Sequence, residues 1–201
     1  MPTHPLTPHN GHRLHWPYVF KRKRQRARNI SASQMAYSQV VSLIGSVLAG
    51  YLLEVNKDEL ALFVGAFVVL PGVFDLGGSI GAALSAKINH LLDSTNRNPI
   101  LVYVQCVWFA LRQALIGSIL VAIVGAGIAA WLFGADMVAV FWLTIGSIFL
   151  STIFGFPLVG LLSVLFYRLG TNPDDVVGPI ESSIFDILTV VTMTIMATVL
   201  L

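Results

Sequence analysis

The sequence predicts an all-α, polytopic membrane protein with five transmembrane helices, its N-terminus in the cytoplasm and its C-terminus outside. Of 201 residues, 56% are hydrophobic and only 11% are charged, whereas a soluble domain carries about 25% charged residues. Five apolar segments reach the length of about 20 residues that a membrane-spanning helix needs. The cations are segregated, because seven of the twelve Lys and Arg residues lie between Arg13 and Arg28. These observations exclude a soluble domain and favour one compact helical bundle.

The chain divides into a basic tail and a membrane domain. Residues 1–29 are polar and then strongly basic, and we expect them to form a disordered cytoplasmic tail. Residues 30–201 are expected to form the five-helix membrane domain. Its predicted spans are Ser33–Leu53, about Leu60–Lys87, Ile100–Phe133, Val138–Tyr167 and Pro179–Leu201.

The third and fourth spans are irregular. As a helix, Ile100–Phe133 would be roughly 51 Å long, against a hydrocarbon core of about 30 Å. We therefore expect Ile100–Arg112 to protrude into the cytoplasm or to lie along the membrane surface. A strongly tilted helix, with Arg112 reaching the boundary, is the alternative. In the fourth span, Gly155–Pro157 predicts a kink.

The charge of the loops sets the predicted orientation. Cytoplasmic loops carry an excess of Lys and Arg, so the basic tail places the N-terminus in the cytosol, and the plasma membrane is the expected location. The inner loops are then His90–Pro99 and Arg168–Asp175, and the outer ones are Glu54–Glu59 and Gly134–Met137. Both inner loops hold an arginine, and only Lys57 opposes the trend.

Three acidic residues, Asp75, Glu181 and Asp186, fall inside the apolar spans. A charge at the centre of a spanning helix costs about 2.5–3.5 kcal/mol on insertion scales, so an intramembrane carboxylate predicts a functional site. Asp75 lies 15 residues after Leu60, and Asp186 lies 15 residues before Leu201. Both would then lie roughly 22 Å below the outer ends of their helices, so we expect them to meet in one layer.

Glu181 and Asp186 are five residues apart, or about 140° around a helix, so they should point in different directions. We expect Asp186 to face a pore and Glu181 to be a vestibule or interface residue. Asp174 and Asp175 precede the last span and are expected at its inner mouth.

Small and polar residues accompany the carboxylates. Gly77, Gly78 and Gly81 follow Asp75, and we expect them to leave room beside it or to unwind the helix there. A packing face of small residues is the alternative. The polar side chains that would bind the waters of an ion, or form helix–helix hydrogen bonds instead, are those of Ser79, Ser85, Asn89, Ser182, Ser183 and Thr189.

Paired carboxylates within a membrane suit hard cations, since Mg²⁺, Ca²⁺ and Mn²⁺ prefer oxygen ligands. Mg²⁺ sheds water reluctantly, so a site with few carboxylates and small polar neighbours would hold it still hydrated. The predicted spans lack His, and the lone Cys106 excludes an internal disulfide and a cysteine-based metal site. Mg²⁺ is therefore the expected cargo, with Mn²⁺, Co²⁺ or Ca²⁺ as competitors.

These residues resemble the MgtE-type divalent cation transporters, above all the short archaeal members and the related eukaryotic solute carriers, which contain two copies of the module. Pro71–Asn89 is similar to the family's helix-two signature. Thr171–Thr189 resembles its final-helix motif, an Asn/Asp-Pro-Asp loop followed by a helix with a Pro at its start and an Asp within it. The resemblance implies a magnesium pathway along a dimer axis, lined by Asp186, with Pro179 at the helix start and Asp75 at the acidic position of the short members.

The resemblance has departures. Gly77, Gly78 and Ser79 match a Gly-Asn region in which Ser79 replaces the usual Asn, so an ion contact by that amide is weakened or lost. Five helices would struggle to enclose a pore, and we expect a homodimer, or a heterodimer with a sister half-module. The other expected partners are the membrane lipid and the divalent cation, and no nucleic acid is expected.

Other functions compete with transport. An intramembrane aspartyl protease also needs two Asp residues on two helices, but its Gly-x-Gly-Asp motif is missing, because here the glycines follow Asp75. A phosphatidyltransferase would need several clustered Asp residues near the cytosolic face, and the second span offers one. A non-transporting partner subunit is the third alternative.

Overall fold

A computed structural model describes residues 32–94, 98–171 and 173–200, and the described residues are helices joined by short turns. Within these residues, five helices are long and apolar enough to cross a membrane, as the sequence predicted. The predicted tail, residues 1–29, lies outside the described residues. The helices are α2 (Ala32–Val55), the short α3 (Lys57–Ala61), α4 (Ala66–Ser94), α5 (Pro99–Phe133), α6 (Met137–Arg168) and α7 (Pro173–Leu200).

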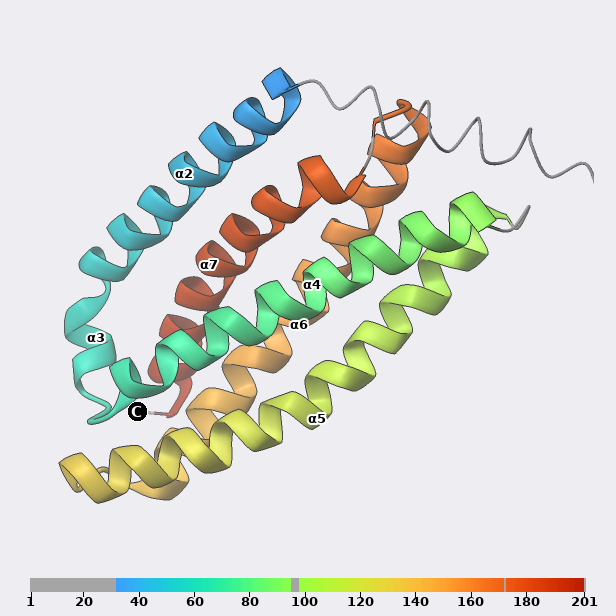
Figure 1. Ribbon diagram of the computed structural model, residues 1–201. Coiled ribbons are helices and arrows are strands. Elements are labelled where there is room, and N and C mark those ends of the chain that lie inside the picture. The colour runs from blue at the N-terminus through green and yellow to red at the C-terminus, as the bar shows by residue number, and fades with distance from the viewer. Residues whose placement is uncertain (1–31, 95–97, 172, 201) are drawn as a thin grey trace, which may run out of the picture.

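Helix α7 lies at the centre of the arrangement (Figure 1). It packs against α2 on one side and against α4 and α6 on the other, while α5 covers α4 and α6. Among the described elements, α2 packs only against α7 and α3. The short α3 lies at the same end of the bundle as the α5–α6 turn (Figure 1).

The second predicted span starts too early. Leu60 belongs to α3, and α4 begins only at Ala66. Gly65, at φ +92, makes the turn between the two helices, and a methyl group there would lie 2.5 Å from Ala129 Cβ of α5. Leu60 is buried together with Phe63. The turn therefore folds back onto α5, which hydropathy along the chain does not reveal.

The last helix begins earlier than predicted. Helix α7 starts at Pro173, and Pro179, expected at the helix start, lies inside it. A proline inside a helix has no N–H to donate to the carbonyl four residues earlier. That carbonyl, Asp175 O, accepts a hydrogen bond from Ser38 Oγ of α2 at 3.2 Å. Helix α2 thus supplies the hydrogen bond that Pro179 cannot donate.

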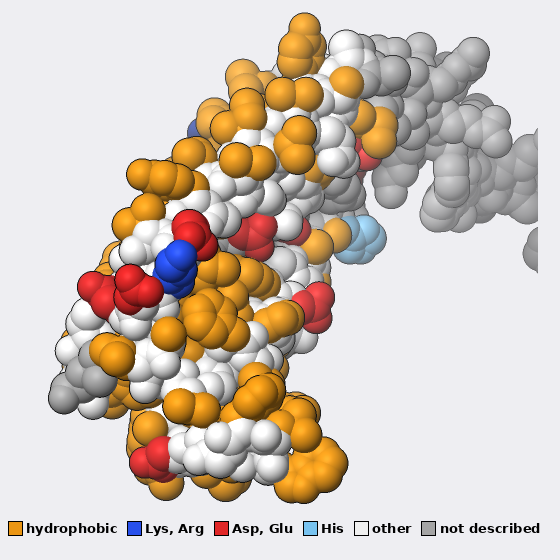
Figure 2. All heavy atoms as spheres, turned by 90° about the vertical axis from the view of Figure 1, so that its left-hand side faces the viewer, with side chains coloured by type: hydrophobic (Ala, Val, Ile, Leu, Met, Phe, Trp, Pro, Cys, Tyr) orange, Lys and Arg blue, Asp and Glu red, His pale blue; other side chains and the backbone are white. Residues whose placement is uncertain are grey.

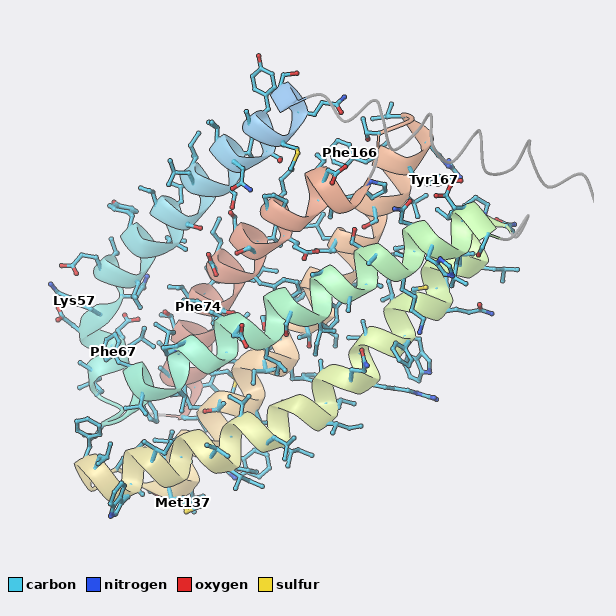
Figure 3. The ribbon with its side chains drawn as sticks, viewed as in Figure 1. Lys57, Phe67, Phe74, Met137, Phe166 and Tyr167 are labelled. Atoms are coloured by element: carbon cyan, nitrogen blue, oxygen red, sulfur yellow. The ribbon has the colours of Figure 1, made fainter. Side chains whose placement is uncertain are left out.

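The long third and fourth spans are single helices. Helix α5 runs unbroken over 35 residues, and α6 continues through Pro157. Between them, Gly134 at φ +66 ends α5, and the Asp136 side chain caps α6 by accepting a hydrogen bond from Val138 N at 2.9 Å. At the other end, the Tyr167 hydroxyl lies 3.1 Å from both Leu92 O and Asp93 Oδ1 and so ties α6 to α4 (Figure 3).

A row of small buried residues on α5 lets α4 and α6 pack closely. Small residues at every helical turn allow backbones to approach each other in membrane proteins. The buried members on α5 are Cys106, Ala110, Ala114, Ser118, Ala122, Ala126 and Ala129. On the opposite face, large apolar side chains such as Ile116 and Leu120 are exposed.

The surface at the α3 end is mixed. Figure 2 shows acidic and basic side chains meeting on a face that is otherwise largely hydrophobic. Exposed charged residues there are Glu54, Lys57, Asp58 and Glu59. Lys57 donates to Glu54, and this hydrogen bond, followed by the attraction of the carboxylate, raises the pKa of Lys57 above its ordinary value.

Candidate functional site

The two intramembrane carboxylates of α7, Glu181 and Asp186, face different helices, as their spacing predicted. Glu181 is 2% exposed and lies against α4, where a methyl group at Gly81 would come within 3.4 Å of Glu181 Oε2. Asp186 is half-buried and faces α2, where Ser46 Oγ donates to its Oδ2 at 3.1 Å. The helix therefore separates a carboxyl group inside the bundle from one at the edge of the α2 contact.

Asp75 is exposed on α4 and forms no hydrogen bond or ion pair with the described residues. Gly77 and Gly81 are among the residues of α4 that contact α7, since a methyl group at either would meet Phe185. Asp75 is two positions from Gly77, about 200° around the helix, so it points away from α7. Within one chain, no described contact joins Asp75 to Asp186.

The corrected helix ends change the estimated depths. Asp75 lies nine residues after Ala66, or roughly 14 Å along α4. Asp186 lies 14 residues before Leu200, or roughly 21 Å from the end of α7. The equal depth counted from Leu60 does not hold, because Leu60 belongs to α3.

Two of the three glycines that follow Asp75 on α4 accommodate an aromatic ring. Phe185 of α7 is fully buried, and a methyl group would lie 2.6 Å from its ring at Gly77, 3.0 Å at Gly81 and 2.5 Å at Gly155 of α6. Gly78 faces open space. Helix α4 is continuous through Gly77, Gly78 and Gly81, so the expected local unwinding is absent. For Gly77 and Gly81 the structure supports the packing alternative.

Of Ser79, Ser182 and Ser183, only Ser183 forms a hydrogen bond with another helix. Its hydroxyl donates to Ser42 O of α2 at 2.7 Å. Ser79 is exposed and donates to Leu76 O of its own helix at 3.3 Å, and Ser182 is exposed. Asp174 and Asp175 lie in the first turn of α7, at the end of the bundle opposite α3.

Sequence reasoning missed the polar face of α2. Ser38 and Ser46 donate to α7, and Ser42 accepts from it. A methyl group at Gly45 would lie 2.5 Å from Ser183 Cβ. Small residues recur about once per turn at Ser38, Ser42, Gly45, Ser46 and Ala49. This spacing was the available signal that one face of the first span packs closely against another helix.

A buried hydroxyl lies one turn beyond Asp186. Thr189 is fully buried, and its Oγ1 has no hydrogen-bond partner among the described residues. In the same described part of the chain, no three His, Cys, Asp or Glu side chains gather as a metal site. Among the described residues of one chain, the oxygen groups along α7 therefore do not enclose a metal ion.

The family comparison decides the class of protein. Residues 70–196 match the MgtE family, described as divalent cation transporters. The chain belongs to the MgtE family. The comparisons with curated proteins and with solved structures returned no match.

This MgtE protein is a multi-pass membrane protein that transports divalent cations. The family is one of transporters and not of enzymes, so the protease and phosphatidyltransferase alternatives are dropped. The matched range begins in α4 and ends in α7 and therefore contains Asp75, Glu181 and Asp186. Helices α2 and α3 lie outside it.

Proposed function

We propose that this MgtE protein carries Mg²⁺ across the plasma membrane along a pathway lined by Asp186 and Asp75 and shared between two chains. The observation that carries the proposal is the exposure of Asp75 within a transmembrane helix. A carboxylate facing lipid there would cost about 2.5–3.5 kcal/mol. A water-filled pathway between two chains removes that cost.

The face of α4 around Asp75 supports a shared pathway. Exposed small or polar residues recur there every three or four positions, at Pro71, Asp75, Ser79, Ala82 and Ala86. A second chain packed on this face would double the number of carboxylates along the pathway. The second chain is another copy, or alternatively a sister half-module.

The chemistry of the site favours a hydrated hard cation. Asp186 supplies negative charge, while Ser46 and Thr189 supply hydroxyl groups beside it or one turn away. Such groups bind the waters that Mg²⁺ retains. Mn²⁺, Co²⁺ and Ca²⁺ are the expected competitors.

The remaining polar groups of α7 receive roles in the same pathway. Glu181 is proposed as a vestibule or interface residue, and Asp174 and Asp175 as the inner mouth. The orientation proposed is N-terminus inside and C-terminus outside, with α3 on the outer surface. Residues 1–29 are proposed as a cytoplasmic tail attached to the membrane domain at 30–201.

Flux measurements test the carboxylates. Purified protein is reconstituted into liposomes that hold a Mg²⁺-sensitive dye, and Asp186→Asn and Asp75→Asn are compared with wild type. Losing a charged hydrogen-bonding group costs about 1.5–3 kcal/mol, so each variant should lose roughly tenfold or more of the flux. Asp136→Asn is the matched control, because Asn caps α6 as well as Asp does. Wild-type flux in both test variants would contradict the proposal.

Crosslinking tests the shared pathway. Ser79→Cys places a thiol on the exposed face of α4 and should form crosslinked dimers in membranes. Ile116→Cys on α5 is the lipid-facing control. Ile116 is 67% exposed, and a cysteine there should not form crosslinked dimers. Equal crosslinking at both positions would contradict a specific dimer along α4.

A further inference from the structure

Two cations on neighbouring helices each stand over an aromatic ring. Lys87 Nζ of α4 lies 3.3 Å from the ring centroid of Phe109 on α5. Arg112 Cζ lies 5.2 Å from the ring centroid of Trp108, one position earlier on α5. Cation–π contacts of this kind orient a cation but leave most of its N–H groups unused.

Neither cation has an acidic partner among the residues that the structure describes. Lys87 and Arg112 form no ion pair or hydrogen bond with any described residue. Each is held over one of two consecutive rings on α5. Helical side chains point toward the N-terminus of their own helix, and α4 and α5 are antiparallel neighbours. Both heads are therefore carried to the level of Trp108 and Phe109, two consecutive rings of α5. Two positive charges at one level of the surface favour an anion beside them.

The level of the rings matches a membrane boundary. Phe109 lies 24 residues before Phe133, the end of α5, which is roughly 36 Å along the helix. The hydrocarbon core is about 30 Å thick, and the headgroup layers extend the bilayer to about 40–45 Å. When the far end of α5 lies at one surface, the two cations lie in the headgroup layer of the other.

We propose that Lys87 and Arg112 form a binding site for the phosphate of an anionic phospholipid. The rings of Trp108 and Phe109 are 57% and 44% exposed, so the site opens toward the lipid rather than into the bundle. Farther along the same helix, toward the membrane centre, exposed apolar side chains such as Ile116 and Leu120 provide a surface for the acyl chains. A phosphate free in solution shares the headgroup chemistry but has no use for that apolar surface.

Lipid-binding measurements test the site on the full chain. Wild type is placed in nanodiscs of neutral phosphatidylcholine with increasing phosphatidylglycerol, and bound lipid is counted by native mass spectrometry. Each surface cation contributes about fivefold to anionic lipid binding, so Lys87→Gln combined with Arg112→Gln should weaken the preference for phosphatidylglycerol roughly thirtyfold. Arg168→Gln is the matched control, because this exposed arginine contacts no described aromatic ring and should keep the preference.

Two further variants separate the site from loss of folding. Lys87→Arg keeps the charge and should keep the preference, whereas Phe109→Leu keeps both charges, loses one ring and should give an intermediate preference. Inorganic phosphate at millimolar concentration should not displace the lipid. The proposal is overturned when wild type binds both lipids equally, when the double Gln variant keeps its preference, or when free phosphate stabilises the protein and the anionic lipid does not.

Discussion

Replacing Gly77 with alanine should destabilise the bundle, whereas the same change at the next residue should not. The added methyl group at Gly77 would lie 2.6 Å from Phe185 Cδ1, closer than real carbon atoms approach. The ring is fully buried and also lies against Gly155 of α6, where a methyl group would come within 2.5 Å of Cε1, so its freedom to move away is limited. At Gly78 a methyl group meets nothing within 4 Å. Two adjacent glycines thus form a matched pair.

The two substitutions should shift the Tm in opposite directions. Overpacking a well-packed core typically costs about 1–3 kcal/mol. For a chain of this length, each kcal/mol shifts the Tm by about 2–4 °C, so Gly77→Ala should lower it by roughly 2–12 °C. Gly78→Ala should raise the Tm by about 1–4 °C, because alanine restricts the unfolded chain and favours helix.

Thermal unfolding in detergent measures both shifts, and Phe185→Leu supplies the second half of a double-mutant cycle. Truncating the ring removes the atoms that the Gly77 methyl group would strike, so Gly77→Ala should cost less in the Phe185→Leu background. The packing account is refuted if Gly77→Ala unfolds at the same temperature as Gly78→Ala, or if its cost is the same with and without the Phe185 ring.

Three other perturbations have definite outcomes. Ser46→Ala removes the donor to Asp186 and should change the concentration of Mg²⁺ that half-saturates flux, while the circular dichroism spectrum stays unchanged. An identical dependence of flux on Mg²⁺ concentration would contradict a role for this contact. Tyr167→Phe breaks the contact between α6 and α4 and should cost about 0.5–1.5 kcal/mol, seen as a lower Tm; an unchanged Tm would show that the contact does not contribute. Because the pKa of Lys57 is raised, its attraction to Glu54 is present at neutral pH and is lost as the pH rises through that raised pKa. Any Tm difference between wild type and Lys57→Gln should therefore vanish in buffer well above about pH 10.4, and a difference that grows there would contradict the pairing.

The position of α2 has a consequence for the mechanism. Within the described part of the chain it contacts only α7 and α3, and its small polar face contains the donor to Asp186. A helix with so few neighbours can shift without disrupting the cores on the other side of α7. Movement of α2 relative to α7 would change the environment of the carboxylate proposed to bind the ion.

The sequence by itself determined the class of the protein. The five spans follow from the length and apolarity of local segments, and the bilayer allows such segments only one regular structure, the helix. The intramembrane acids were equally visible, because their energetic cost depends on their position within a span. The stretches Pro71–Asn89 and Thr171–Thr189 also indicated the family. Each of these properties is local in the chain.

The tertiary structure decided what each residue contacts. Gly77 and Gly81 look alike in the sequence whether they border a cavity or a ring, and only the position of Phe185 distinguishes the two cases. The break after Leu60 and the early start of α7 depend on contacts with other helices. Glu181 and Asp186 are separated by the angle of a helix, but which one is buried depends on where α4 and α2 pack. Packing is a relation between segments distant in sequence, so hydropathy along the chain carries no record of it.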